Sequence, residues 1–294
     1  MKKKKIYLHI GFHKTGTSAL QEFLNDNREQ LEKNGIFYPK SYGSSYPGNV
    51  DLSWAFNPNP PKWGNVTDEN RTTILDYYMA QIQDTKADKT IISSEDFSLL
   101  DSNFEIIENI KEYFIDFEVT IVAYVREPVD FIFSLYSHAI RSRNISMDLK
   151  KYIADVFNFR SGDFPLRLQV WRRVFGKESL VVRKYDPRNF LNNSLVDDFF
   201  DAISLNNDIK QEMKKSNIGI HPWLINAYIE ISSSSLPEDI KNKKLRDLVN
   251  LGSDLPKTKA LEYLISTEDI SIIKNSYQVS YNRLKREYGI SFES

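Results

Sequence analysis

The chain has 294 residues, of which 41% are hydrophobic, so it can bury a sizeable core. Its net charge of −1 and isoelectric point of about 6.5 argue against general electrostatic attraction to nucleic acid, and any anion site must be a local cluster of basic groups. The absence of cysteine excludes a disulfide framework, a zinc–thiolate site and a cysteine nucleophile.

The N-terminal residues are basic but do not read as a targeting signal. Lys2–Lys5 precede a short apolar stretch that already contains His9, so we interpret them as a solvated segment ahead of a strand, with a membrane or nucleic-acid contact as the alternative. No apolar run approaches the length that crosses a bilayer. We therefore expect a soluble protein, and the lack of cysteine fits a reducing, cytoplasmic compartment.

The first elements in chain order are a strand, a helix and a second strand. Ile6–Ile10 is a short apolar run closed by a glycine, which predicts a buried strand. Apolar residues at helical spacing predict a helix over Thr17–Lys33, which an Asn-Gly pair ends. Ile36–Tyr38 predicts a short strand that stops at Pro39.

Residues 40–66 interrupt this pattern. The proline-rich run Asn57–Pro61 forbids a regular helix or a central strand at that point. A long aromatic loop is unusual in a compact domain and is often functional. Its aromatic residues are Tyr42, Tyr46, Trp54, Phe56 and Trp63.

Strands and helices alternate along most of the remaining chain. Further strands are predicted over Thr90–Ser93, Val119–Val125 and Ser179–Lys184, and helices over 68–86, Phe104–Phe114, from Pro128 onward, and over 268–287. Such alternation predicts an α/β fold with a central parallel sheet flanked by helices. Beyond residue 190 the pattern is mainly helical. We therefore expect one domain over residues 1–294, with an α/β nucleotide-binding core (1–190) and a helical C-terminal part (191–294).

The segment between the first strand and the first helix has the composition of an anion-binding loop. Unpaired N–H groups and the positive helix end point into such a junction. Gly11 and Gly16 have the spacing of the triphosphate loop G-x-x-x-x-G-K-[ST], and Ser18 falls on its last position. Thr17, however, replaces the lysine of that loop, and the basic residue is Lys14 instead. The sequence therefore predicts a phosphate cradle with altered chemistry.

The run Lys14–Ser18 (KTGTS) resembles the 5′-phosphosulfate loop, K-[ST]-G-T-[ST], of sulfotransferases that use 3′-phosphoadenosine-5′-phosphosulfate (PAPS). The resemblance implies a P-loop-like fold of the bacterial carbohydrate sulfotransferase type. It also implies that Lys14 stabilises charge on the leaving phosphate, and that Lys14, Thr15, Gly16, Thr17 and Ser18 bind the donor.

A second motif lies in the order that this family requires. Arg126 follows the Val119–Val125 strand, Pro128 comes two residues later and Ser134 eight residues later. In the family this Arg and Ser bind the 3′-phosphate, and a guanidinium at the end of a parallel strand suits that contact on physical grounds. A surface ion pair for Arg126 is the alternative.

Two weaker resemblances lie further along the chain. Tyr185, followed by Asp186, resembles the family's tyrosine–acid pair near the adenine. Lys215 and Ser216, within Lys214–Asn217, resemble the segment that closes over the 3′-phosphate. Either could equally be a turn or a solvated charge cluster.

An acceptor hydroxyl needs a general base, for which the sequence offers three candidates. Glu95 follows the Thr90–Ser93 strand at the functional edge of the sheet, and the run Ser93–Glu95 resembles bacterial members of the family. An acid at a helix N-cap is the alternative role, open to Glu95 or Asp96. His13 ranks second because it adjoins Lys14, and His138, on the helix face of Ser134, ranks third.

These motifs predict sulfuryl transfer from PAPS to an acceptor hydroxyl or amine, with adenosine 3′,5′-bisphosphate (PAP) as product and no metal requirement. The aromatic loop weakly favours a carbohydrate or glycolipid acceptor. A metal-dependent nucleotide kinase or NTPase and a catalytically inactive module that binds PAP or a glycan are the alternatives. The oligomeric state is left open.

Overall fold

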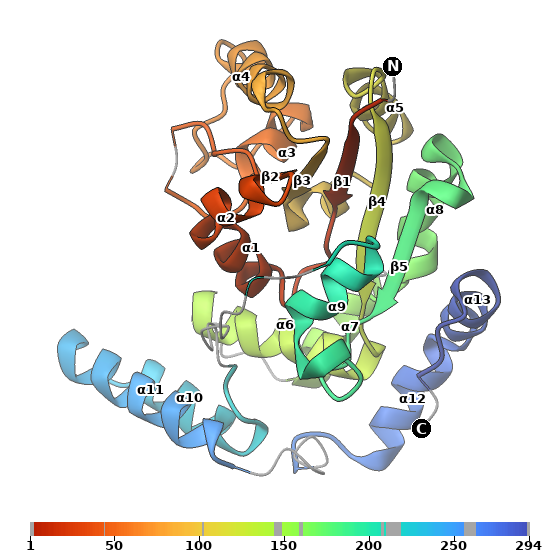
Figure 1. Cartoon of the computed structure of the whole chain (residues 1–294). Helices are drawn as coiled ribbons and strands as arrows, with labels where there is room; N and C mark the ends of the chain where they lie inside the picture. Colours follow the sequence, from red (N-terminus) through yellow and green to blue (C-terminus); the bar gives the residue numbers. More distant parts are fainter. Residues whose placement is uncertain are drawn as a thin grey trace. The chain divides into compact units, whose positions relative to one another are not determined.

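The computed structural model describes residues 3–43, 45–101, 103–143, 149–158, 161–206, 209, 219–255 and 263–292. The chain divides into two compact units (Figure 1). The first unit comprises Met1–Arg126 and Pro165–Lys214, and the second comprises Glu127–Phe164 and Lys215–Ser294. The sequence predicts one domain whose core ends near residue 190, and this stays a prediction.

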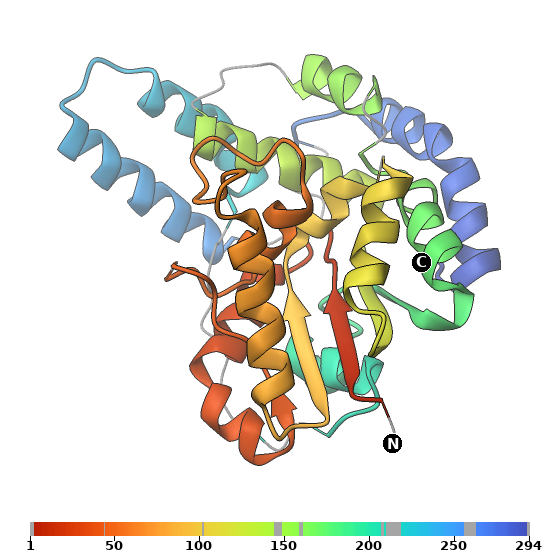
Figure 2. The ribbon, with the colours of Figure 1, turned by 90° about the horizontal axis from the view of Figure 1, so that it is seen from above.

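The first unit contains a five-stranded, wholly parallel sheet in the order β2-β3-β1-β4-β5. The strands are β1 (Lys5–His9), β2 (Ile36–Phe37), β3 (Lys89–Ser93), β4 (Glu118–Val125) and β5 (Leu180–Lys184). Figure 2 shows the central neighbours β1 and β3 running in the same direction, with His9 in register with Ser93 at their carboxyl ends. This topology confirms the predicted α/β fold with a central parallel sheet.

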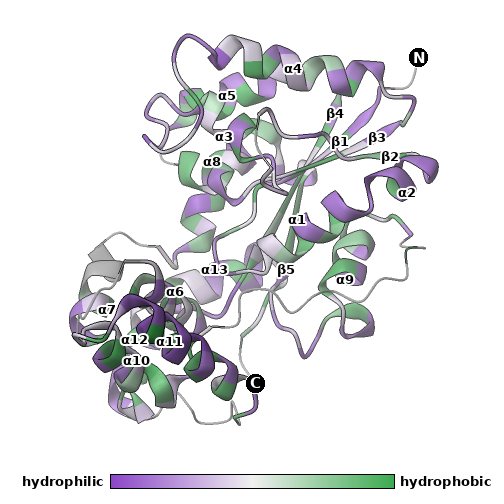
Figure 3. Ribbon diagram, turned by 90° about the vertical axis from the view of Figure 1, so that its left-hand side faces the viewer, coloured by the Kyte–Doolittle hydropathy of each residue, from purple (hydrophilic) through white to green (hydrophobic). Residues whose placement is uncertain are grey.

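Helices cover both faces of this sheet, and Figure 3 shows the two layers with the strands between them. One layer contains α1 (Thr17–Asp26), α2 (Arg28–Lys33) and α9 (Leu195–Ala202); the other contains α3 (Val50–Phe56), α4 (Arg71–Asp84), α5 (Phe104–Tyr113) and α8 (Phe164–Phe175). Leu24 of α1, Phe199 of α9 and Tyr124 of β4 belong to one buried cluster. Burial of both faces explains why the strands read as continuous apolar runs instead of alternating ones.

Three sequence expectations about helices were wrong in detail. The predicted helix over Thr17–Lys33 is two helices, because the chain breaks at Asn27. The aromatic segment 40–66 is not all loop, since it contains α3. All six residues from Val50 to Ala55 are buried, so tertiary packing supports this helix. The helix ends just before the proline-rich run. The predicted terminal helix is likewise two helices that meet at Tyr277.

The second unit is helical and has its own core. Its helices are α6 (Pro128–Arg143), α7 (Leu149–Asn158), α10 (Ile225–Ser232), α11 (Glu238–Ser253), α12 (Thr267–Ser276) and α13 (Gln278–Tyr288). Three short 3₁₀ turns complete the described elements outside the site: η2 (Lys177–Ser179), η3 (Leu191–Asn193) and η4 (Pro222–Leu224). The Tyr281 hydroxyl donates to Glu127 Oε1 at 2.5 Å, which joins α13 to the start of α6. In the part of the chain that the structure describes, no helix has the length and apolarity to span a bilayer.

Candidate functional site

The loop between β1 and α1 has the backbone of an anion cradle. Gly11, Lys14 and Gly16 all have positive φ angles, of 32°, 66° and 78°. This conformation is ordinary for glycine but uncommon for lysine, and such local strain is concentrated at functional positions. The Gly16 carbonyl accepts the first helical bonds, from the amides of Ala19 and Leu20. The amides of Thr17 and Ser18 therefore have no intrahelical partner and are available to bind an anion.

The three hydroxyl residues of this loop have different surroundings. Thr15 is buried, and its hydroxyl donates to the Phe12 carbonyl at 2.5 Å, which stabilises the conformation of the loop. Thr17 is 4% exposed, and its Oγ1 has no hydrogen-bond partner among the described residues. A buried hydroxyl left unpaired is costly, and a phosphate oxygen would satisfy it. Ser18 lies close enough to the Tyr46 phenol of the aromatic segment to influence its pKa.

Arg126 and Lys14 meet in the structure. Arg126 Nη1 donates to the Lys14 carbonyl at 3.0 Å, and its guanidinium carbon lies 5.6 Å from the centre of the Tyr185 ring. Burial raises the pKa of Tyr185, and the charge of Arg126 opposes that rise. A Cβ atom on Gly16 would lie only 2.9 Å from Tyr185 Cε2, so the loop needs glycine beside this ring. We call Lys14, Gly16, Arg126 and Tyr185 the basic side of the site.

The basic side therefore forms at the carboxyl ends of three adjacent strands. Its residues come from the loop after β1, the end of β4 and the end of β5. Ligands of open α/β sheets bind at this edge. The two sequence motifs at Lys14 and Arg126, 112 residues apart, belong to one site.

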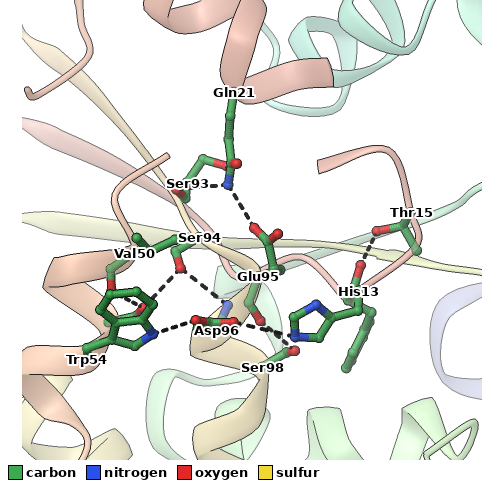
Figure 4. Close-up of polar contacts among 12 residues, drawn as sticks. His13, Thr15, Gln21, Val50, Trp54, Ser93, Ser94, Glu95, Asp96 and Ser98 are labelled. Carbon is green, nitrogen blue, oxygen red and sulfur yellow. Dashed lines mark hydrogen bonds and ion pairs between the residues drawn. The ribbon is translucent and has the colours of Figure 1, made fainter. Parts of the chain in front are cut away.

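Glu95 lies at the same edge, two residues after the end of β3, and begins the 3₁₀ turn η1 (Glu95–Leu100). Its Oε2 accepts a hydrogen bond of 2.9 Å from Gln21 Nε2 on α1 (Figure 4). Ser94, rather than either acid, caps η1, because its hydroxyl accepts from the Asp96 amide at 3.2 Å. The N-cap alternative for Glu95 and Asp96 was therefore wrong.

Asp96 connects the loop histidine with the aromatic segment. Asp96 Oδ1 lies 3.5 Å from His13 Nε2, and its Oδ2 accepts from Trp54 Nε1 (Figure 4). The exposed ring of Trp63 packs edge-on against Trp54, with the ring centres 4.9 Å apart. We call His13, Trp54, Glu95 and Asp96 the carboxylate side of the site.

Tyr46 brings a further part of the aromatic segment close to Glu95 and Asp96. Burial, followed by the negative charges of Glu95 and Asp96, raises the pKa of Tyr46 to about 12, while the hydrogen bond with Ser18 opposes the rise. The phenol is 40% exposed and, like any tyrosine, is protonated at neutral pH, so it can donate a hydrogen bond to a ligand. Tyr46 is therefore close enough to Ser18 of the anion loop and to the two carboxylates for them to influence its pKa.

Four other predicted site residues belong to the second unit. Ser134 and His138 are on α6 in the second unit, where His138 is exposed, and their relation to the loop stays a prediction. Lys215 and Ser216 lie outside the described residues.

Asp186, the partner of Tyr185 in the sequence motif, is held by its own neighbours. Arg188 binds both of its oxygens at 2.9 Å, and Asn189 adds a third contact. The hydrogen bonds from Arg188 hold the pKa of Asp186 well below its usual range. In the structure this carboxylate anchors the turn after β5.

Sequence reasoning missed Gln21 and the part played by Tyr46. Gln21 had a detectable signal, since it falls on the buried stripe of α1, four residues after Thr17 and three before Leu24. Tyr46 had none beyond its place in an aromatic segment, because the contact with Ser18 joins parts of the chain 28 residues apart. In the part of the chain that is described, no three acidic or histidine side chains are grouped to hold a metal.

No protein-family model matches the sequence, and no curated protein matches it. Among solved structures, the chain is similar to a sulfotransferase from Alicyclobacillus acidocaldarius. The two share 17% sequence identity with a TM-score of 0.44, over 88% of this chain and 94% of that chain.

Proposed function

We propose that this protein transfers a sulfuryl group from PAPS to an acceptor hydroxyl or amine, with a carbohydrate or glycolipid as the acceptor. The observation that carries the proposal is the 3.0 Å hydrogen bond between Arg126 and the Lys14 carbonyl, which joins two anion-binding motifs in one site. A nucleotide with phosphate groups at both its 5′ and 3′ positions needs two such cationic groups close together.

The loop fits the 5′ end of this donor. The amides at the start of α1 and the unpaired hydroxyl of Thr17 supply donors for phosphate oxygens. Lys14 would stabilise negative charge on the leaving phosphate. Arg126 would bind the 3′-phosphate, and the Tyr185 ring offers an apolar face for the adenine.

The carboxylate side fits the acceptor. Glu95 would accept the proton of the acceptor hydroxyl or amine while the sulfuryl group moves to that oxygen or nitrogen. Sulfuryl transfer requires mainly positioning and charge stabilisation, by analogy with phosphoryl transfer. The exposed rings of Tyr46 and Trp63 suit the apolar faces of sugar rings, and the adjoining carboxylates suit their hydroxyl groups.

Ligand-dependent thermal stability tests this proposal against the alternatives. PAP should raise the melting temperature, because a ligand at 100 times its dissociation constant stabilises the native state by about 2.7 kcal/mol. ATP with Mg²⁺ should raise it much less, and the reverse order would favour a kinase or NTPase. Binding of PAP without transfer from labelled PAPS to any sugar, phenol or amine would identify an inactive binding module.

A further inference from the structure

Gln21 is a buried polar side chain that none of the sequence motifs explains. It is 0% exposed, although it is an amide on the same helix as the buried core residues Leu20 and Leu24. Burying an amide is costly unless it is hydrogen-bonded, and a methionine of similar length would fill the space without that cost. Its polarity therefore calls for a reason other than packing.

The amide group of Gln21 links the end of β3 to Glu95. Its Nε2 lies 3.2 Å from the Ser93 carbonyl and 2.9 Å from Glu95 Oε2 (Figure 4). Both partners are acceptors, so the NH₂ group must face them, and both of its N–H bonds are used. Ser93 is itself fixed, because its hydroxyl lies 2.8 Å from Nδ1 of the buried His9.

The aromatic segment closes over the other side of this amide. A Cβ atom on Gly48 would lie 2.5–2.7 Å from the Cδ, Oε1 and Nε2 atoms of Gln21. Only glycine lets the backbone approach this closely. Gly48 is also held in place, since its carbonyl accepts a 2.7 Å hydrogen bond from Ser41. The amide is therefore confined between the backbone of residue 48 and the end of β3.

We propose that Gln21 is a positioning residue that holds the Glu95 carboxylate in the orientation needed to take the acceptor's proton. Gln21 lies on the helix that begins at the anion loop, so it ties the position of the base to the position of the donor site. This inference rests on the proposed function. The inference goes beyond that function by assigning α1 a second role besides anion binding.

The variant Gln21→Met tests the inference, because it keeps the length of the side chain and removes both N–H donors. We expect kcat to fall about 10- to 100-fold, which is the cost of a misplacement near 1 Å. The KM for PAPS and the affinity for PAP should stay within about twofold of wild type, since the anion loop is unchanged. Gln30→Met, an exposed change on the neighbouring α2, is the matched control and should leave all three quantities unchanged.

Two further variants separate positioning from a structural effect. In a Glu95→Gln background, Gln21→Met should lower the remaining turnover less than about twofold, because the group it positions is already gone. Gly48→Ala keeps Gln21 but displaces its amide, so it should reproduce the loss in kcat with PAP binding intact.

The outcomes distinguish this inference from the proposed function. Wild-type kcat in a folded, PAP-binding Gln21→Met protein would overturn the inference alone, as would an equal loss in both backgrounds. Failure of the wild-type protein to bind PAP would overturn the proposed function instead.

Discussion

The basic side of the site is held mainly by backbone groups, whereas the carboxylate side is held by buried polar side chains. On the basic side, Arg126 donates to the Lys14 carbonyl, and the amides of Thr17 and Ser18 have no intrahelical partner. On the carboxylate side, Gln21 and Trp54 each donate to an acid. Backbone donors suit an anion whose charge must be spread over many bonds, while a base must be fixed in one orientation. This difference is what the proposed donor and acceptor sites would require.

The largest expected effect comes from Glu95 on the carboxylate side. Glu95→Gln keeps the shape and an acceptor oxygen for Gln21 but cannot take a proton. We expect turnover to fall about 10²- to 10⁴-fold, as for loss of a general base, with PAP affinity nearly unchanged. Steady-state rates with labelled PAPS and calorimetric titration with PAP measure the two quantities. Glu29→Gln, an exposed change on α2, is the control.

Normal turnover in Glu95→Gln would reassign the base. His13, which lies 3.5 Å from Asp96, would then be the next residue to replace. His13→Asn should in that case lower turnover as expected for loss of the general base.

On the basic side, Lys14 is the residue whose replacement should lower turnover most. Lys14→Met should lower kcat about 10²- to 10³-fold, because one preorganised group that stabilises developing charge is removed. The exposed Lys33→Met serves as control. If kcat stays unchanged while PAPS binding weakens, Lys14 binds the donor but does not act on the leaving phosphate.

Arg126 should have a smaller effect, on binding rather than on rate. Arg126→Met removes the hydrogen bond to the Lys14 carbonyl and the proposed contact with the 3′-phosphate. We expect PAP affinity to fall about 10- to 100-fold, the range for hydrogen bonds to charged groups. Adenosine 5′-phosphosulfate, which lacks the 3′-phosphate, should lose much less affinity, and an equal loss for both nucleotides would argue against this contact. Arg246→Met on α11 is the control.

The same contrast explains what the sequence could predict. The parallel sheet, Lys14 and Arg126 follow from local patterns, because apolar strands and the residues directly after them occupy the same edge in any fold of this class. Contacts made by Gln21, Asp96 and Tyr46 depend on how distant segments pack, and no local pattern encodes that. The same reason applies to α3, whose helix is supported by burial in a segment that reads as loop.

His9 beneath the site gives a prediction about stability. Burial lowers its pKa to about 3, against an ordinary value of 6.5. Below pH 6.5 the unfolded chain takes up a proton that the native protein does not, so stability is present above 6.5 and is lost as the pH falls toward 3. This one group should reduce the free energy of unfolding by up to about 1.4 kcal/mol for each pH unit in that window. Urea unfolding of wild type and His9→Asn across this range measures it, and an unchanged slope in the variant would exclude His9 as the source.

The smallest effect is expected at the outer end of the carboxylate side, where Trp63 is 79% exposed and packs only its edge on Trp54. A ring so exposed contributes little to the core, so Trp63→Ala should leave the free energy of unfolding nearly unchanged. If the ring stacks on the acceptor, the acceptor KM should rise about 2- to 10-fold, the value of one aromatic contact, while kcat and PAP affinity stay constant. Tyr263→Ala, a comparably exposed aromatic change in the second unit, should alter none of these. An unchanged acceptor KM for Trp63→Ala would leave Tyr46, which is also exposed, as the aromatic residue that contacts the acceptor.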